Sequence, residues 1–169
     1  MLGSCSNLTS IDLSGFDLSN VINMDGVFFL CENITSINLS NFNTSKVKNM
    51  DSMFSLGNLW NKHSSITSLD LSSFDTSEVE NMCSMFSSCS NLTSLDLSSF
   101  DTSKVTDMSY MFRNCSNLKT IKGVIDMKSC TNYENMFNNC SKLSGGKIKN
   151  PPSGFNGAGL SSSQYTIVS

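Results

Sequence analysis

Apolar and polar positions recur along the chain with a period of 26 residues, which indicates a structural repeat rather than a single helix or strand. The stretches "HSSITSLDLSSFDTSEVENMCSMFSSC" and "CSNLTSLDLSSFDTSKVTDMSYMFRNC" are nearly identical. Repeats begin near residues 5, 31, 63, 89 and 115, once six extra residues after Phe54 and one residue missing from "IKGVI" are allowed for. The chain therefore consists of one short unit repeated about five times.

In this register the apolar residues fall into columns, and substitutions within a column keep the apolar character. One column holds Phe16, Phe42, Phe74, Phe100 and Ile125, and another holds Phe28, Phe54, Phe86, Phe112 and Phe137. Stacked coils require this pattern, because each coil covers the apolar face of its neighbour and none could bury that face alone. We predict a solenoid of about five repeats over residues 1–140 and a C-terminal cap over residues 141–169.

Each repeat carries signals for short elements. The alternation in L-x-L predicts a short strand with its leucines inward, and "SSFDTS" predicts a turn. Met108, Met111 and Phe112 have helical spacing, and Asp107 stands where a cap is expected. The pattern predicts parallel strands along one side of a right-handed coil and short helical turns along another.

The stretch "LTSLDLSSFDTSKVTDMSYMF", with its L-x-x-L-x-L spacing, resembles the BspA-like branch of leucine-rich-repeat proteins, whose units carry "FDTSxVTDMSxMFxxC". The resemblance runs from Cys5 to about Cys140. It implies a leucine-rich-repeat-like solenoid in a bacterial cell-surface or secreted protein, with adhesion as the expected activity. It supplies no catalytic residues, so we expect no enzyme.

Composition limits the partners. Only 15% of the residues are charged, the net charge is -3, and no basic stripe is present to bind the phosphates of a nucleic acid. No apolar run approaches the length of a membrane span, so we expect no membrane insertion by this segment. The chain begins in the middle of a repeat, and we expect either preceding residues or a second chain stacked end to end there.

Candidate binding residues lie on two features. Leu59 and Trp60 belong to the six-residue insertion, where an aromatic side chain is either a contact residue or packs back onto the coils. Ser68, Ser94, Asp70 and Asp96 belong to the outward positions of the strands, which form a hydroxyl-rich face. The two aspartates are either solvated or paired like the carboxylates of a glycosidase. His63 is a further binding candidate, although a lone histidine is more often a packing or surface residue.

The cysteine and aspartate columns invite a metal interpretation that the spacing does not favour. Five cysteines share one column with His63, but the short C-x₂₋₄-C pairs of zinc sites are missing. We predict that Cys89 and Cys115 are buried and reduced, and that Cys83 is the reactive thiol. The column of Asp17, Asp75 and Asp101 favours Asx turns over calcium. We expect no metal and no cofactor.

These observations favour a non-enzymatic binding module at a bacterial surface. The expected partner is a protein or glycan on a host or neighbouring cell, bound on the repeat face or the insertion. A phage or virion fibre domain, at a virion surface, is the alternative. A carbohydrate-active enzyme is a further alternative, which would need an assembled acid–base pair.

Overall fold

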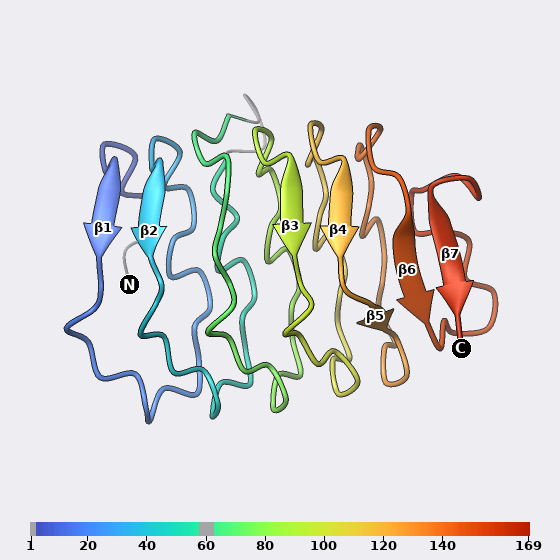
Figure 1. Cartoon of the computed structure of the whole chain (residues 1–169), viewed down its shortest axis with the longest axis horizontal. Helices are drawn as coiled ribbons and strands as arrows, with labels where there is room; N and C mark the ends of the chain where they lie inside the picture. The colour runs from blue at the N-terminus through green and yellow to red at the C-terminus, as the bar shows by residue number, and fades with distance from the viewer. Residues whose placement is uncertain (1–2, 58–62) are drawn as a thin grey trace.

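The chain of this computed structural model forms successive coils that lie side by side along its long axis (Figure 1). The structure describes residues 3–57 and 63–169. The strands are β1 (Ser10–Asp12), β2 (Ser36–Asn38), β3 (Ser94–Asp96), β4 (Thr120–Lys122), β5 (Ile125–Asp126), β6 (Gly146–Lys149) and β7 (Tyr165–Val168). β1 and β7 lie at opposite ends of the row and point the same way (Figure 1).

Neighbouring strands pair in parallel with the offset of one repeat. Ser10 is opposite Ser36 in the β1–β2 pair, and Ser94 is opposite Thr120 in the β3–β4 pair. β5, β6 and β7 form a third parallel sheet. Residues 68–70 occupy the corresponding position in the coil after the insertion, but they lie outside any strand. The expected ladder is therefore divided into three short sheets.

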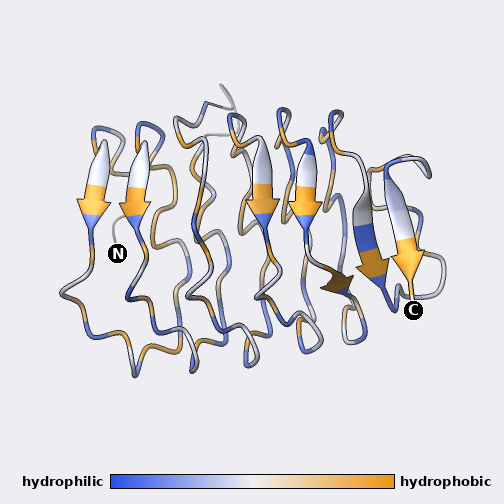
Figure 2. Cartoon of the chain, viewed as in Figure 1, coloured by the Kyte–Doolittle hydropathy of each residue, from blue (hydrophilic) through white to orange (hydrophobic). Residues whose placement is uncertain are grey.

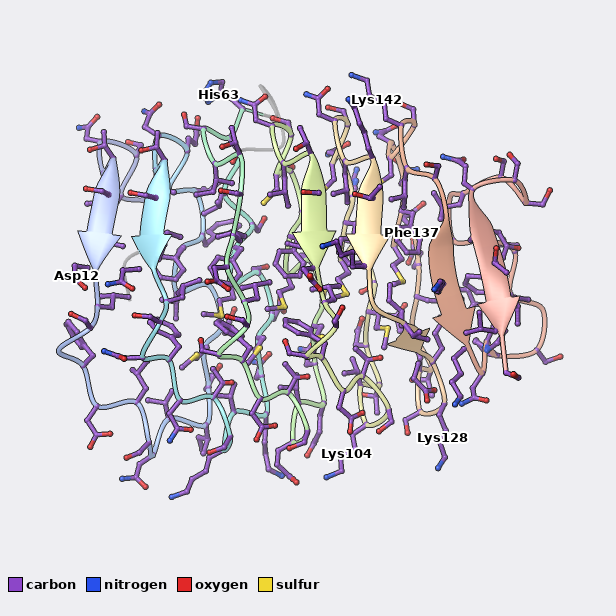
Figure 3. The ribbon with its side chains drawn as sticks, viewed as in Figure 1. Asp12, His63, Lys104, Lys128, Phe137 and Lys142 are labelled. Atoms are coloured by element: carbon purple, nitrogen blue, oxygen red, sulfur yellow. The ribbon has the colours of Figure 1, made fainter. Side chains whose placement is uncertain are left out.

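The core is made of stacked rings and aliphatic side chains from successive coils. Phe54 lies between Phe28 and Phe86, with ring centroids 5.4 and 5.8 Å apart and nearly parallel planes. The row continues through Phe112 to Phe137, which lies inside the stack (Figure 3). Such spacings are those of offset-stacked aromatic pairs. The hydrophobic bands on β1–β4 lie at the same height (Figure 2), because the register aligns equivalent leucines and isoleucines.

The predicted helical turns are wrong: the described residues contain no helix. In the segment from Met82 to Ser88, alternate N–H groups bond locally, as from Met85 to the Met82 carbonyl at 3.2 Å. The others donate to the next coil, as from Ser84 to the Ser109 carbonyl at 2.8 Å. Ser84 and Ser88, which both donate to the next coil, have φ values of 53° and 61°, in the left-handed region that an α-helix does not use. The apolar residues with helical spacing therefore lie in a run of tight turns and not in a helix.

The C-terminal segment covers the last repeat. The Phe137 N–H donates to the Ala158 carbonyl at 2.8 Å, and Ala158 and Leu160 are buried. Phe155 packs between Tyr133 and Tyr165, with centroid distances of 5.4 and 5.6 Å. At the other end, Phe16 of the first coil is 61% exposed, whereas its equivalents in the following coils are buried. The C-terminal segment thus covers the last repeat, whereas Phe16 of the first coil is left exposed.

Candidate functional site

The outward side of the strands carries a column of polar residues at the point where each strand ends. Asp12, Asn38, Asp70 and Asp96 share this position, and Lys122 replaces them in the last coil. Each of the four accepts a hydrogen bond on Oδ1 from the backbone N–H two residues on, at 2.9 to 3.2 Å. This Asx geometry holds the side chains in a fixed row along the exposed face.

Asp70 and Asp96 are brought to the same hollow by this row. The hollow has a volume of about 260 Å³ and is lined by Leu69, Asp70, Leu71, Ser72, Asp96, Ser98 and Ser99. The Ser72 hydroxyl and then its backbone N–H lower the pKa of Asp70, and the same two groups of Ser98 lower that of Asp96. Both carboxylates are therefore ionised acceptors near neutral pH, and neither is set up as a proton donor.

A surface ion pair lies beside this hollow. Lys122 Nζ is 3.4 Å from Asp96 Oδ2, and the two side chains are 73% and 55% exposed. Solvent screens a pair of this kind, so it contributes little to stability. The ion pair leaves Asp96 available to a ligand, because exchange with another donor costs little.

The other predicted residues fall at different places. Ser68 and Ser94 are exposed on the same face as Asp70 and Asp96, two positions earlier in each coil. His63 is exposed and lies at the upper edge of the coils, away from Asp12 (Figure 3). Leu59 and Trp60 lie outside the described residues. The structure thus brings the two aspartates together, and it sets His63 apart from their row.

The second aspartate column forms Asx turns. Asp17, Asp75 and Asp101 each accept the backbone N–H two residues on, at 2.9 to 3.0 Å. Within the described part of the chain, no three histidine, cysteine or acidic side chains gather closely enough to hold a metal ion. The carboxylates in this column are engaged in shaping the turn rather than directed at a shared centre.

The cysteines of the shared column are buried from Cys31 onward, whereas Cys5 in the first coil is exposed. Cys89 and Cys115 are fully buried, and their Sγ atoms donate to the carbonyls of Phe54 and Phe86, at 3.0 and 3.1 Å. Burial raises the pKa of Cys89 to about 12. The burial predicted for Cys89 and Cys115 is confirmed, and a thiol that donates a hydrogen bond must keep its proton.

Cys83 does not have the features predicted for a reactive thiol. It is half-buried, accepts a hydrogen bond from Ser109 Oγ at 3.3 Å, and has a raised pKa because of desolvation. A raised pKa reduces the thiolate fraction on which reactivity depends. The exposed cysteine of the chain is Cys5.

Another hollow, which the sequence pattern did not predict, lies on the turn side of the coils. It has a volume of about 150 Å³ and is lined by Phe29, Leu30, Ser52, Ser55, Gly57, Ser84, Ser87, Tyr110 and Arg113. The Arg113 guanidinium lies over the Tyr110 ring, 5.3 Å from its centroid. Departure from the repeat could have revealed these two residues, since Tyr110 and Arg113 replace serines of the preceding coil.

The stacked 26-residue coils and their exposed polar row define a repeat protein with an extended surface. The chain belongs to the family described as Mycoplasma protein of unknown function, DUF285, whose model matches residues 1–67 and 56–150. This family is part of the BspA-like group of repeat surface proteins. No curated protein and no solved structure gives a significant match. Across the described residues, no helix is long and apolar enough to cross a membrane.

Proposed function

We propose that this chain is a right-handed, leucine-rich-repeat-like solenoid that acts as a non-enzymatic binding module on a bacterial surface. Its ligand is a glycan carried by a host or neighbouring cell, held in the hollow between Asp70 and Asp96. Membership of the BspA-like group supports the surface setting. Repeat proteins bind through extended faces of this kind, which supports the choice of the strand side.

The observation that carries the proposal is the chemistry of the hollow. Two carboxylates with lowered pKa values lie among the polar groups of Ser72, Ser98 and Ser99. Carboxylate and hydroxyl oxygens accept hydrogen bonds from sugar hydroxyls, while Leu69 and Leu71 supply a small apolar floor. A binding role is favoured over glycoside hydrolysis, because that reaction needs one carboxyl group with a raised pKa.

A glycan array probed with the 169-residue chain tests this proposal. We expect binding to a limited set of glycans, and a loss of at least about tenfold in affinity for the Asp70→Asn/Asp96→Asn variant, since each amide removes an ionised acceptor. The change keeps Oδ1 in place for the Asx turn.

The matched control is Asp75→Asn/Asp101→Asn, which alters two carboxylates of the same kind outside the hollow. This variant should bind as the parent chain does. Absence of any bound glycan, or equal losses in both double variants, would overturn the assignment of the hollow. Binding to cell-surface proteins alone would replace the glycan by a protein ligand.

A further inference from the structure

The apolar column that begins at Phe16 is exposed at both of its ends. Phe16 starts this column, and its ring-bearing equivalents Phe42 and Phe74 stack at 5.9 Å. At the other end Ile125 is opposite Ile148, and Ile148 is opposite Ile167. Phe16 is 61% exposed and Ile167 is 58% exposed, although the members between them are buried.

Within the described residues, the first coil has an open apolar face and a strand edge with one neighbour. An apolar hollow of about 270 Å³ lies beside Phe16, lined among others by Leu18, Val21 and Val27. Among the described residues β1 pairs only with β2, and β7 pairs only with β6. Each end of the stack therefore presents backbone N–H and C=O groups that a further parallel strand could pair with.

The ends also carry opposite charges. Residues 1–30 contain Asp12, Asp17 and Asp25 and no Lys or Arg. Residues 141–169 contain Lys142, Lys147 and Lys149 and no Asp or Glu. Opposite charges at the two ends favour contact between unlike ends and oppose contact between like ends.

We propose that the first coil docks onto β7 of a second copy of this chain, head to tail. β1 and β7 point the same way (Figure 1), so translation along the long axis places β1 of one copy beside β7 of the other in parallel orientation. Phe16 of one copy then covers Ile167 of the other and continues the column. The contact uses unlike surfaces and does not close on itself, so it builds linear chains.

Sedimentation velocity of the 169-residue chain over a range of concentrations tests the proposal. The average mass is expected to rise with concentration beyond twice the 18.4 kDa of one chain, and less so at high salt, which screens the charged ends. Phe16→Asp or Ile167→Asp should each weaken association at least about tenfold. A chain that stays monomeric at every concentration would overturn the proposal and indicate that another segment or partner covers the first coil.

Mixing the two variants separates head-to-tail contact from the other geometries. Phe16→Asp keeps an intact β7 end and Ile167→Asp keeps an intact first coil, so the mixture should form a one-to-one pair that neither variant forms alone. Self-association of Ile167→Asp would indicate first-coil contacts between copies and would contradict the proposal. The matched control is Ile22→Asp, since Ile22 is equally exposed on the first coil but lies in an outward column with Lys48 and Glu80.

A second pair of variants keeps the proposal testable if either aspartate substitution prevents folding, which circular dichroism would show. Reversing the charges in Lys147→Glu/Lys149→Glu should weaken association, because it removes the attraction between unlike ends. Combining it with a partner that carries Asp12→Lys/Asp17→Lys should restore the contact. Failure of this combination to restore it would contradict the assigned surfaces.

Discussion

Buried threonine side chains join neighbouring coils at the "FDTS" turn. The Thr76 hydroxyl donates to the Asp101 carbonyl at 2.9 Å and accepts from the Asp101 N–H at 2.8 Å. Thr44 and Thr102 make the same pair of bonds with Asp75 and Asp126. One hydroxyl thus satisfies two backbone groups of the next coil, which would otherwise be left without partners.

Replacement of Thr76 by valine tests this role. Valine keeps the shape but leaves both backbone groups of Asp101 unpaired, so we expect a loss of about 2–3 kcal/mol in the free energy of unfolding. Urea denaturation measures the loss. Thr93→Val, at an exposed position of the next repeat, should change stability by less than about 0.5 kcal/mol. Equal effects of the two substitutions would show that the buried hydroxyl has no special part.

The thiol of Cys89 leads to a prediction at alkaline pH. Its pKa is about 12 in the folded chain against an ordinary value of 9.0, because burial disfavours the thiolate. The stability linked to this group is fully present below pH 9 and is lost as the pH rises toward 12. Denaturation between pH 8 and 11 should show this decline.

Cys89→Ala should make that decline shallower and should lower stability near neutral pH by about 1 kcal/mol, the scale of one small buried group. Reducing agent should leave the melting temperature of the parent chain unchanged. A large drop on reduction would reveal a disulfide and would contradict packing as the role of the column.

At the scale of elements, tight turns occupy the segment from Met82 to Ser88, where the sequence pattern predicted a short helix. Left-handed residues recur at one position of the repeat, at Gly26, Ser52, Ser84, Tyr110 and Asn135. The same side of the coil carries isolated parallel bridges, as between Asn81 and Asp107. Each coil is thereby hydrogen-bonded to the next along the turn side as well as along the strands.

Substitution of Ser84 distinguishes these turns from a helix. Glycine adopts a positive φ freely, so Ser84→Gly should leave stability unchanged or slightly higher, whereas Ser84→Val should lower it by about 1–2 kcal/mol. Thermal unfolding of both variants checks the difference. In a helix, the glycine substitution would lower stability more than the valine substitution.

The carboxylates of the whole stack make stability depend on acid pH. Six aspartates have lowered pKa values because hydroxyl and backbone groups two residues on donate to them: Asp12, Asp17, Asp70, Asp75, Asp96 and Asp101. A lowered pKa gives stability that is present above the ordinary value of 3.8 and is lost as the pH falls through the folded value. Asp51 acts in the opposite sense, since burial raises its pKa.

The net expectation is a steady loss of stability as the pH is lowered from about 5 to below 3. Urea denaturation at a series of pH values measures it. Asp75→Asn/Asp101→Asn should make the dependence shallower, because two of the contributing groups no longer titrate. A midpoint that stays constant from pH 6 to pH 3 would contradict this account.

The sequence by itself determined which residues form the core. The 26-residue period placed Leu95, Phe100, Val105 and Phe112 in apolar columns, and all four lie in one buried cluster. Burial of Cys89 and Cys115 followed from the same logic, because neighbouring coils cover the inward positions of a stack; His63, beside the insertion in the same column, is exposed.

The tertiary structure alone decided which atoms bond across coils and which members of a column stay exposed. The partner of the Thr76 hydroxyl is 25 residues away, and the partner of the Ser84 N–H is equally distant. Local spacing could not reveal these bonds, so the M-x-x-M-F pattern predicted a helix in place of turns. Phe16 and Phe42 are both phenylalanines at equivalent positions of the repeat, yet only Phe42 is buried. Phe42 has a described coil on each side, whereas Phe16 has one on one side only, and burial of the ring depends on the second coil.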